Sequence, residues 1–152
     1  MKIVCSRPFE ASHPSALAIY CSDGRFTDAV RELALALGHK RHDAMCVPGG
    51  AATLTSSWTN RVIDAEAALR ETSFLIAAHA IADVLLIAHW GCGYYRNHYP
   101  KIAPERIHEI QIADLARASE LLLGAHSVRV ASFYARVGAV VEFEPLSEQK
   151  MA

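Results

Sequence analysis

The order of apolar and polar residues along this chain predicts alternating strands and helices. The expected strands are short apolar runs bounded by turn-forming residues, at 16–20, 44–47, 84–88, 128–133 and 139–143. The expected helices carry apolar residues at spacings of three and four, at 27–37, 57–80 and 104–123. This alternation favours an α/β fold with a mainly parallel central sheet flanked on both faces by helices.

The length and composition fit one domain with a substantial core. The chain has 152 residues, of which 52% are hydrophobic and 20% are charged. We therefore expect a single domain over 1–152, in which 1–15 form a short N-terminal extension. In parallel α/β sheets, functional sites lie at the carboxyl ends of the strands, which draws attention to Cys21, Gly49 and His89.

Charge and hydropathy exclude several classes of protein. The formal net charge is -1, and no basic cluster of the kind that binds nucleic acid is present. No apolar run approaches the roughly 18 residues of a membrane span, and the first 14 residues lack a signal-peptide pattern. We therefore expect a cytoplasmic protein that binds neither nucleic acid nor membrane. In a reducing compartment, the four cysteines favour metal binding or catalysis over disulfides.

Two short motifs directly follow the expected strands. The first is Cys21-Ser22-Asp23-Gly24-Arg25, and the second is His89-Trp90-Gly91-Cys92-Gly93. If the two strands are neighbours, two thiolates and one imidazole converge, and this donor set suits zinc. Three protein ligands leave a fourth position for water, which is the pattern of catalytic rather than structural zinc sites.

Each of these residues also has an ordinary structural explanation. A single buried cysteine is usually a small apolar residue, and a histidine at a strand end is often only hydrogen-bonded. The joint arrangement is what favours a metal site. Other chemistries fail on spacing, because a cysteine phosphatase would need an arginine where Thr27 stands. A dinucleotide-binding loop would need a glycine at Arg96, and no Cys-x-x-Cys pair is present.

The paired motifs resemble those of the β-class carbonic anhydrases, which carry C-x-D-x-R after one core strand and H-x-x-C-G after a later one. The order, the spacing and the succession of elements are similar from about Ala16 onward. The resemblance implies a zinc enzyme, a homodimer or larger homo-oligomer. It implies reversible hydration of carbon dioxide to bicarbonate by a zinc-bound hydroxide.

The resemblance also implies individual roles. Cys21, His89 and Cys92 match the zinc ligands, and Asp23 and Arg25 match a catalytic Asp-Arg pair. In that family the arginine holds the aspartate away from the metal, and the aspartate accepts a hydrogen bond from the zinc-bound water. Asp23 is also a possible fourth ligand in a closed state.

This chain departs from the family pattern in two places. The segment 47–50 reads Val-Pro-Gly-Gly where many members have Arg-Asn-Ala-Gly, and the segment before Ala16 is too short for most of the family's helical arm. Two alternatives therefore stay open at this stage. One is a related zinc hydrolase of carbonyl sulfide or carbon disulfide, and the other is a zinc-binding protein without catalytic activity.

Overall fold

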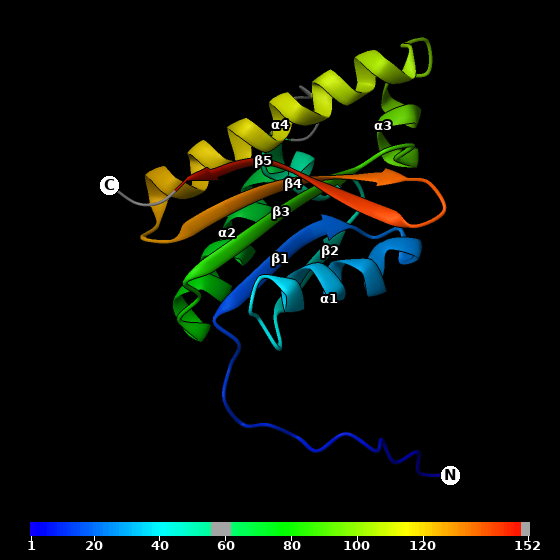
Figure 1. Ribbon diagram of the computed structural model, residues 1–152. Helices are drawn as coiled ribbons and strands as arrows, with labels where there is room; N and C mark the ends of the chain where they lie inside the picture. The colour runs from blue at the N-terminus through cyan, green and yellow to red at the C-terminus, as the bar shows by residue number, and fades with distance from the viewer. Residues whose placement is uncertain (56–61, 150–152) are drawn as a thin grey trace.

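A five-stranded sheet runs through the middle of the protein (Figure 1). The computed structural model describes residues 1–55 and 62–149. Within them the strand order is β2-β1-β3-β4-β5, with the first four strands parallel and β5 antiparallel to β4. The mainly parallel sheet is thus confirmed. The strands are β1 (Ala16–Cys21), β2 (Asp43–Val47), β3 (Asp83–His89), β4 (Arg129–Val137) and β5 (Val141–Gln149).

Helices cover both faces of this sheet, as expected, with α1 on one face and α2 and α4 on the other (Figure 1). Two short 3-10 helices follow the carboxyl ends of β1 and β2, and the short helix α3 follows β3. The α-helices are α1 (Thr27–Ala36), α2 (Val62–His79), α3 (Gly93–His98) and α4 (Pro104–Ala125), and the 3-10 helices are η1 (Gly24–Phe26) and η2 (Gly50–Leu54).

Burial on both sides explains why β1 and β3 are uninterrupted apolar runs. Successive side chains of a strand point to opposite faces of the sheet. In β1, Leu17 and Ile19 pack into the core beneath α2 and α4, whereas Ala18 and Tyr20 pack beneath α1. A polar residue in either strand would therefore be buried whichever face it occupied.

The expected helices differ from the observed ones in a few positions. The segment 57–61, including Trp58, lies outside the described residues, so the start predicted at residue 57 is not compared. Helix α4 continues past residue 123, where the expected helix ended, through Gly124 to Ala125. Ala116, which the apolar spacing of the expected helix at 104–123 places on its buried face, is exposed. Polar residues share the buried face of α4 instead, namely Gln111, Asp114 and Ser119.

The first 15 residues form neither a helix nor a strand and extend away from the sheet (Figure 1). In the described part of the chain, no helix is both long and apolar enough to cross a membrane.

Candidate metal centre

The centre lies where the central parallel strands end. Strands β1 and β3 are paired neighbours, so Cys21 at the end of β1 and His89 at the end of β3 reach the same edge of the sheet. The chain then turns at Gly91, whose φ of 71° is in the left-handed region that glycine favours. This turn brings Cys92, the residue before α3, back over the strand ends.

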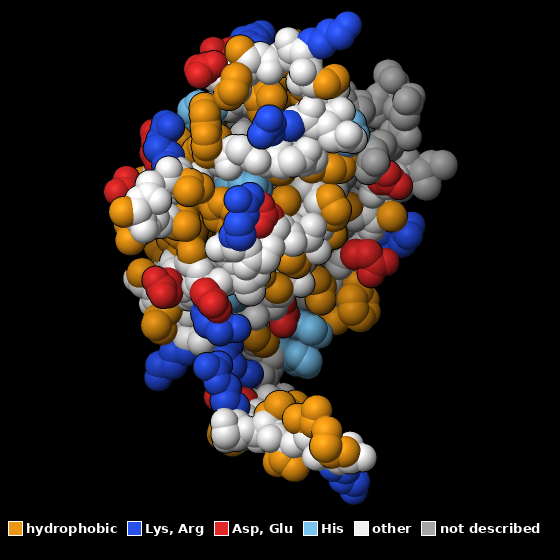
Figure 2. Space-filling view, turned by 90° about the vertical axis from the view of Figure 1, so that its right-hand side faces the viewer, with side chains coloured by type: hydrophobic (Ala, Val, Ile, Leu, Met, Phe, Trp, Pro, Cys, Tyr) orange, Lys and Arg blue, Asp and Glu red, His pale blue; other side chains and the backbone are white. Residues whose placement is uncertain are grey.

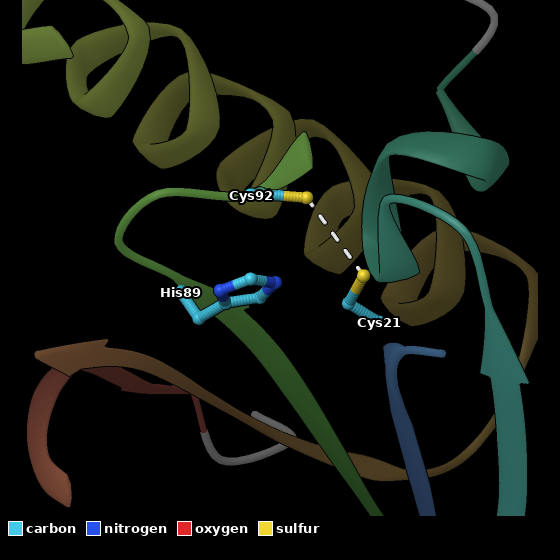
Figure 3. A group of neighbouring side chains, drawn as sticks. All are labelled: Cys21, His89 and Cys92. Atoms are coloured by element: carbon cyan, nitrogen blue, oxygen red, sulfur yellow. Dashed lines mark hydrogen bonds between the residues drawn. The ribbon is translucent and has the colours of Figure 1, made fainter. Parts of the chain in front are cut away.

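The potential ligand atoms of Cys21, His89 and Cys92 all lie within 4.8 Å of one another. The two sulfur atoms are 3.7 Å apart, and the imidazole faces them from the end of β3 (Figure 3). All three side chains are buried, with exposed fractions of 8%, 3% and 1%. The residues that the motifs selected are therefore brought together by the fold.

The orientation of His89 fits a metal ligand. Its Nδ1 lies 3.0 Å from the backbone oxygen of Trp90, and because a carbonyl only accepts, Nδ1 carries the proton and donates. The other nitrogen, Nε2, then presents a lone pair. It is buried and has no hydrogen-bond partner among the described residues. A buried, unpartnered acceptor beside two thiols is the arrangement that a thiophilic cation such as zinc satisfies.

The two thiols have opposite tendencies to ionise. The hydrogen bond from Cys92 is the largest cause that lowers the pKa of Cys21, to about 4, while burial opposes it. Cys92 keeps the shared proton, so its pKa is raised, and burial raises it further. One thiolate is thus favoured even without a cation, and a bound cation would favour the second because metal ligands must be deprotonated.

Asp23 is held by Arg25 and not by the cysteine-histidine group. The guanidinium Nη2 lies 2.6 Å from Asp23 Oδ2, and Nε lies 2.9 Å from Oδ1. These hydrogen bonds lower the pKa of Asp23 to about 2. Among the described residues, the group with mutually close ligand atoms contains Cys21, His89 and Cys92 without Asp23. The fork of Arg25 therefore holds the Asp23 carboxylate outside the group of Cys21, His89 and Cys92.

The glycines of the segment 47–50 fit the close packing around the centre. Gly50 has a φ of 56° and lies against the backbone of β1 beside Cys21. Gly49 has a φ of 81°, and a Cβ there would meet the ring of Tyr94 at 2.3 Å. The chain differs from the family pattern at residues 47 and 48, but it keeps glycine at positions 49 and 50, where a residue with a Cβ would not fit easily.

Aromatic residues beside the motif have separate roles. Trp90 is partly exposed and lines a cavity of ≈ 170 Å³ next to Cys92. Tyr95 is fully buried, and its hydroxyl donates to Asp114 at 2.7 Å. The sequence motif did not single out Asp114 or the neighbouring Gln111. The only signal for them was their place on an otherwise apolar face of α4.

Comparisons with known proteins give a match at the level of structure alone. No family model matches the chain, and no curated protein matches its sequence. A tetrameric β-carbonic anhydrase of Sordaria macrospora is similar in structure, with a TM-score of 0.55, 14% identity, and coverage of 88% of this chain and 81% of that one. A β-carbonic anhydrase of Trichomonas vaginalis gives a TM-score of 0.54 at 12% identity, over 92% and 87% of the two chains.

A third similar structure is a β-carbonic anhydrase of Aspergillus fumigatus, with a TM-score of 0.53 and 12% identity over 95% of each chain. Because each comparison covers 88% or more of this chain, the similarity extends over most of the fold. The protein therefore has a β-carbonic anhydrase-like fold, as the motifs predicted.

Proposed function

We propose that this protein is a zinc-dependent carbonic anhydrase that hydrates carbon dioxide reversibly to bicarbonate. The observation that carries the proposal is a three-residue ligand group, Cys21, His89 and Cys92, beside an aspartate that is already engaged by arginine. Three ligands with the nearby carboxylate withdrawn correspond to an open zinc site rather than a closed one.

In this proposal each side chain has a distinct task. Cys21 and Cys92 bind zinc as thiolates, and His89 binds through Nε2 while Trp90 O holds its Nδ1 proton. Bound zinc lowers the pKa of water to about 7 and so supplies a nucleophile at neutral pH. Asp23 is ionised and accepts a hydrogen bond from the attacking hydroxide, and this hydrogen bond orients the hydroxide. Arg25 keeps Asp23 available for this purpose and prevents it from becoming a fourth ligand.

The proposed assembly is a homodimer or a larger homo-oligomer in the cytoplasm. Figure 2 views the protein from the side on which the parallel strands end, and hydrophobic side chains lie across this face between charged groups. Light scattering at micromolar concentration should give at least twice the mass of the 16.6 kDa chain. In the described residues after the N-terminal extension, the large hydrophobic side chains that are exposed are Leu35, Leu37, Phe74, Trp90, Ile102, Leu121, Val137 and Val140.

The test of function combines metal analysis with a hydration assay. Purified protein should contain about one zinc per chain, and zinc-loaded protein should accelerate carbon dioxide hydration in a stopped-flow assay with a pH indicator. Hydrolysis of carbonyl sulfide or carbon disulfide by a protein inactive on carbon dioxide would instead assign the sulfur chemistry. Full zinc content with no turnover of any of these compounds would assign a non-catalytic role.

The Asp23–Arg25 pair has its own test. Arg25→Ala should leave the zinc content near normal and reduce turnover by orders of magnitude, because the released Asp23 can then bind the metal. Arg31→Ala is a matched control, since Arg31 pairs with Asp28 on the surface at 3.5 Å and neither residue belongs to the ligand group. An Arg25→Ala protein with full zinc and the wild-type hydration rate would refute the proposed role of Arg25.

A further inference from the structure

Helix α4 contacts the loop that carries the ligands through a fully buried amide. Gln111 is 1% exposed, and its Nε2 donates to the backbone oxygen of His89 at 3.0 Å. The same side chain accepts at Oε1 from the hydroxyl of Tyr134, also at 3.0 Å. Gln111 therefore joins the end of β3 to β4 at the position of the histidine ligand.

The partners of Gln111 fix the orientation of its amide. A backbone carbonyl only accepts, so the nitrogen of the amide must face His89 O. The amide oxygen then faces Tyr134, whose hydroxyl has to donate. Reversing the amide would place its oxygen against the carbonyl of His89 and leave two buried acceptors unsatisfied, which is costly. One orientation of Gln111 is thus specified by its surroundings.

A second buried contact joins α4 to the other side of the same loop. Asp114, one helical turn after Gln111, is 0% exposed and accepts from the hydroxyl of Tyr95 at 2.7 Å. Tyr95 belongs to α3, whose first residue directly follows Cys92. Arg117 also contacts the Asp114 carboxylate, so that carboxylate is paired with a cation. The two contacts of α4 therefore lie on either side of the segment from His89 to Cys92.

We infer that Gln111 and Asp114 are positioning residues that set the separation of His89 and Cys92 for metal binding. This inference rests on the proposed metal centre. The loop between these ligands contains Trp90 and Gly91, and Gly91 has a positive φ. The conformation of such a loop depends on how its two ends are held, and α4, a single rigid element, holds both of them. Groups that orient metal ligands from outside the ligand set typically change metal affinity about 10- to 100-fold when removed.

The test is the zinc affinity of Gln111→Met, which keeps the length of the side chain and removes both hydrogen bonds. Competition with a chromophoric chelator should show zinc affinity lowered about tenfold, the lower end of the usual range, because Gln111 acts through the backbone of His89. Tyr95→Phe, which removes the contact to Asp114, should weaken zinc in the same direction. In both variants the visible spectrum of the cobalt-substituted protein should shift, since that spectrum reports ligand geometry.

Ser119→Ala is the matched control, because Ser119 is another buried polar residue of α4 and its hydroxyl has no partner among the described residues. It should change neither zinc affinity nor the cobalt spectrum. If Gln111→Met does not fold, Tyr134→Phe removes the partner of the Gln111 amide and should also weaken zinc. Wild-type zinc affinity and an unshifted cobalt spectrum in the folded variants would overturn the inference while leaving the metal centre intact. A wild-type protein that binds no zinc would overturn both.

Discussion

Replacing Gly50 by alanine should destabilise the protein through two separate effects. Gly50 has a φ of 56°, which an L-residue with a Cβ adopts only with strain. A Cβ at this position would also lie 2.9 Å from the backbone nitrogen of Cys21, 2.9 Å from the backbone carbon of Tyr20 and 3.1 Å from the backbone oxygen of Ile87. These atoms belong to β1 and β3, so they cannot move aside as the end of a flexible side chain can.

The two effects give a magnitude. A left-handed conformation costs a residue with a Cβ about 1 to 2 kcal/mol. Overpacking in a well-packed region costs about 1 to 3 kcal/mol. Together they predict that Gly50→Ala lowers the free energy of unfolding by about 2 to 5 kcal/mol, a large fraction of the stability of an ordinary domain. Because Cys21 carries one of the clashing atoms, zinc affinity should fall as well.

Urea unfolding of the metal-free protein measures this effect, and two other glycines separate its parts. Gly38 has a φ of 91° but nothing within 4 Å of its Cβ position, so Gly38→Ala should show the strain alone, about 1 to 2 kcal/mol. Gly93 begins α3, has free space around its Cβ position, and should tolerate alanine with no loss of stability. Stability of Gly50→Ala equal to that of Gly38→Ala would refute the clash, and stability equal to that of Gly93→Ala would refute both effects.

Three further predictions concern the centre and its neighbours. Cys92→Ser should reduce zinc content in elemental analysis, because a hard hydroxyl replaces a soft thiolate; zinc retained at one per chain would contradict this. In the metal-free protein, where Asp23 has no zinc to bind, Arg25→Ala should return the pKa of Asp23 from about 2 towards its ordinary value in a carboxyl-carbon NMR titration, because the hydrogen-bonding guanidinium is gone. In the wild type the stabilisation from this pair should be present above about pH 4 and lost as the pH falls through about 2; an unchanged Asp23 titration in the variant would contradict the assignment. Removing zinc with a chelator should lower the melting temperature of the wild-type protein, because zinc binds the folded state. An equal melting temperature with and without zinc would contradict zinc binding to the folded protein.

Much of the sheet could be predicted because its central strands are buried on both faces. The runs at 16–20 and 84–88 have no polar position, and such runs in an alternating chain are typical of parallel strands. The edge strand β2 was harder, because its residues alternate between partly buried and exposed. Cys46 illustrates this: it is exposed, although an apolar residue in an expected strand suggests a core position. The short helix α3 has too few residues for a helical period.

The ligand candidates were predictable because each stands at the end of an apolar run, and the ends of neighbouring parallel strands meet at one edge. Whether β1 and β3 are adjacent, however, depends on the strand order, which the amino-acid sequence alone does not specify. The supporting residues Gln111 and Asp114 were not predictable. A polar residue on an apolar helix face acquires meaning only from its partner, and Gln111 is partnered by a backbone carbonyl that no sequence pattern distinguishes.

The separation of the two thiols along the chain has a consequence for folding. Cys21 and Cys92 are 71 positions apart, and the crossover through β2 and α2 lies between them. The complete ligand group therefore cannot exist until β1 and β3 have paired, and closing so long a loop is a slow, entropically costly step. Zinc binding during refolding would consequently be a late event. The signal of a fluorescent zinc indicator would then report when β1 pairs with β3.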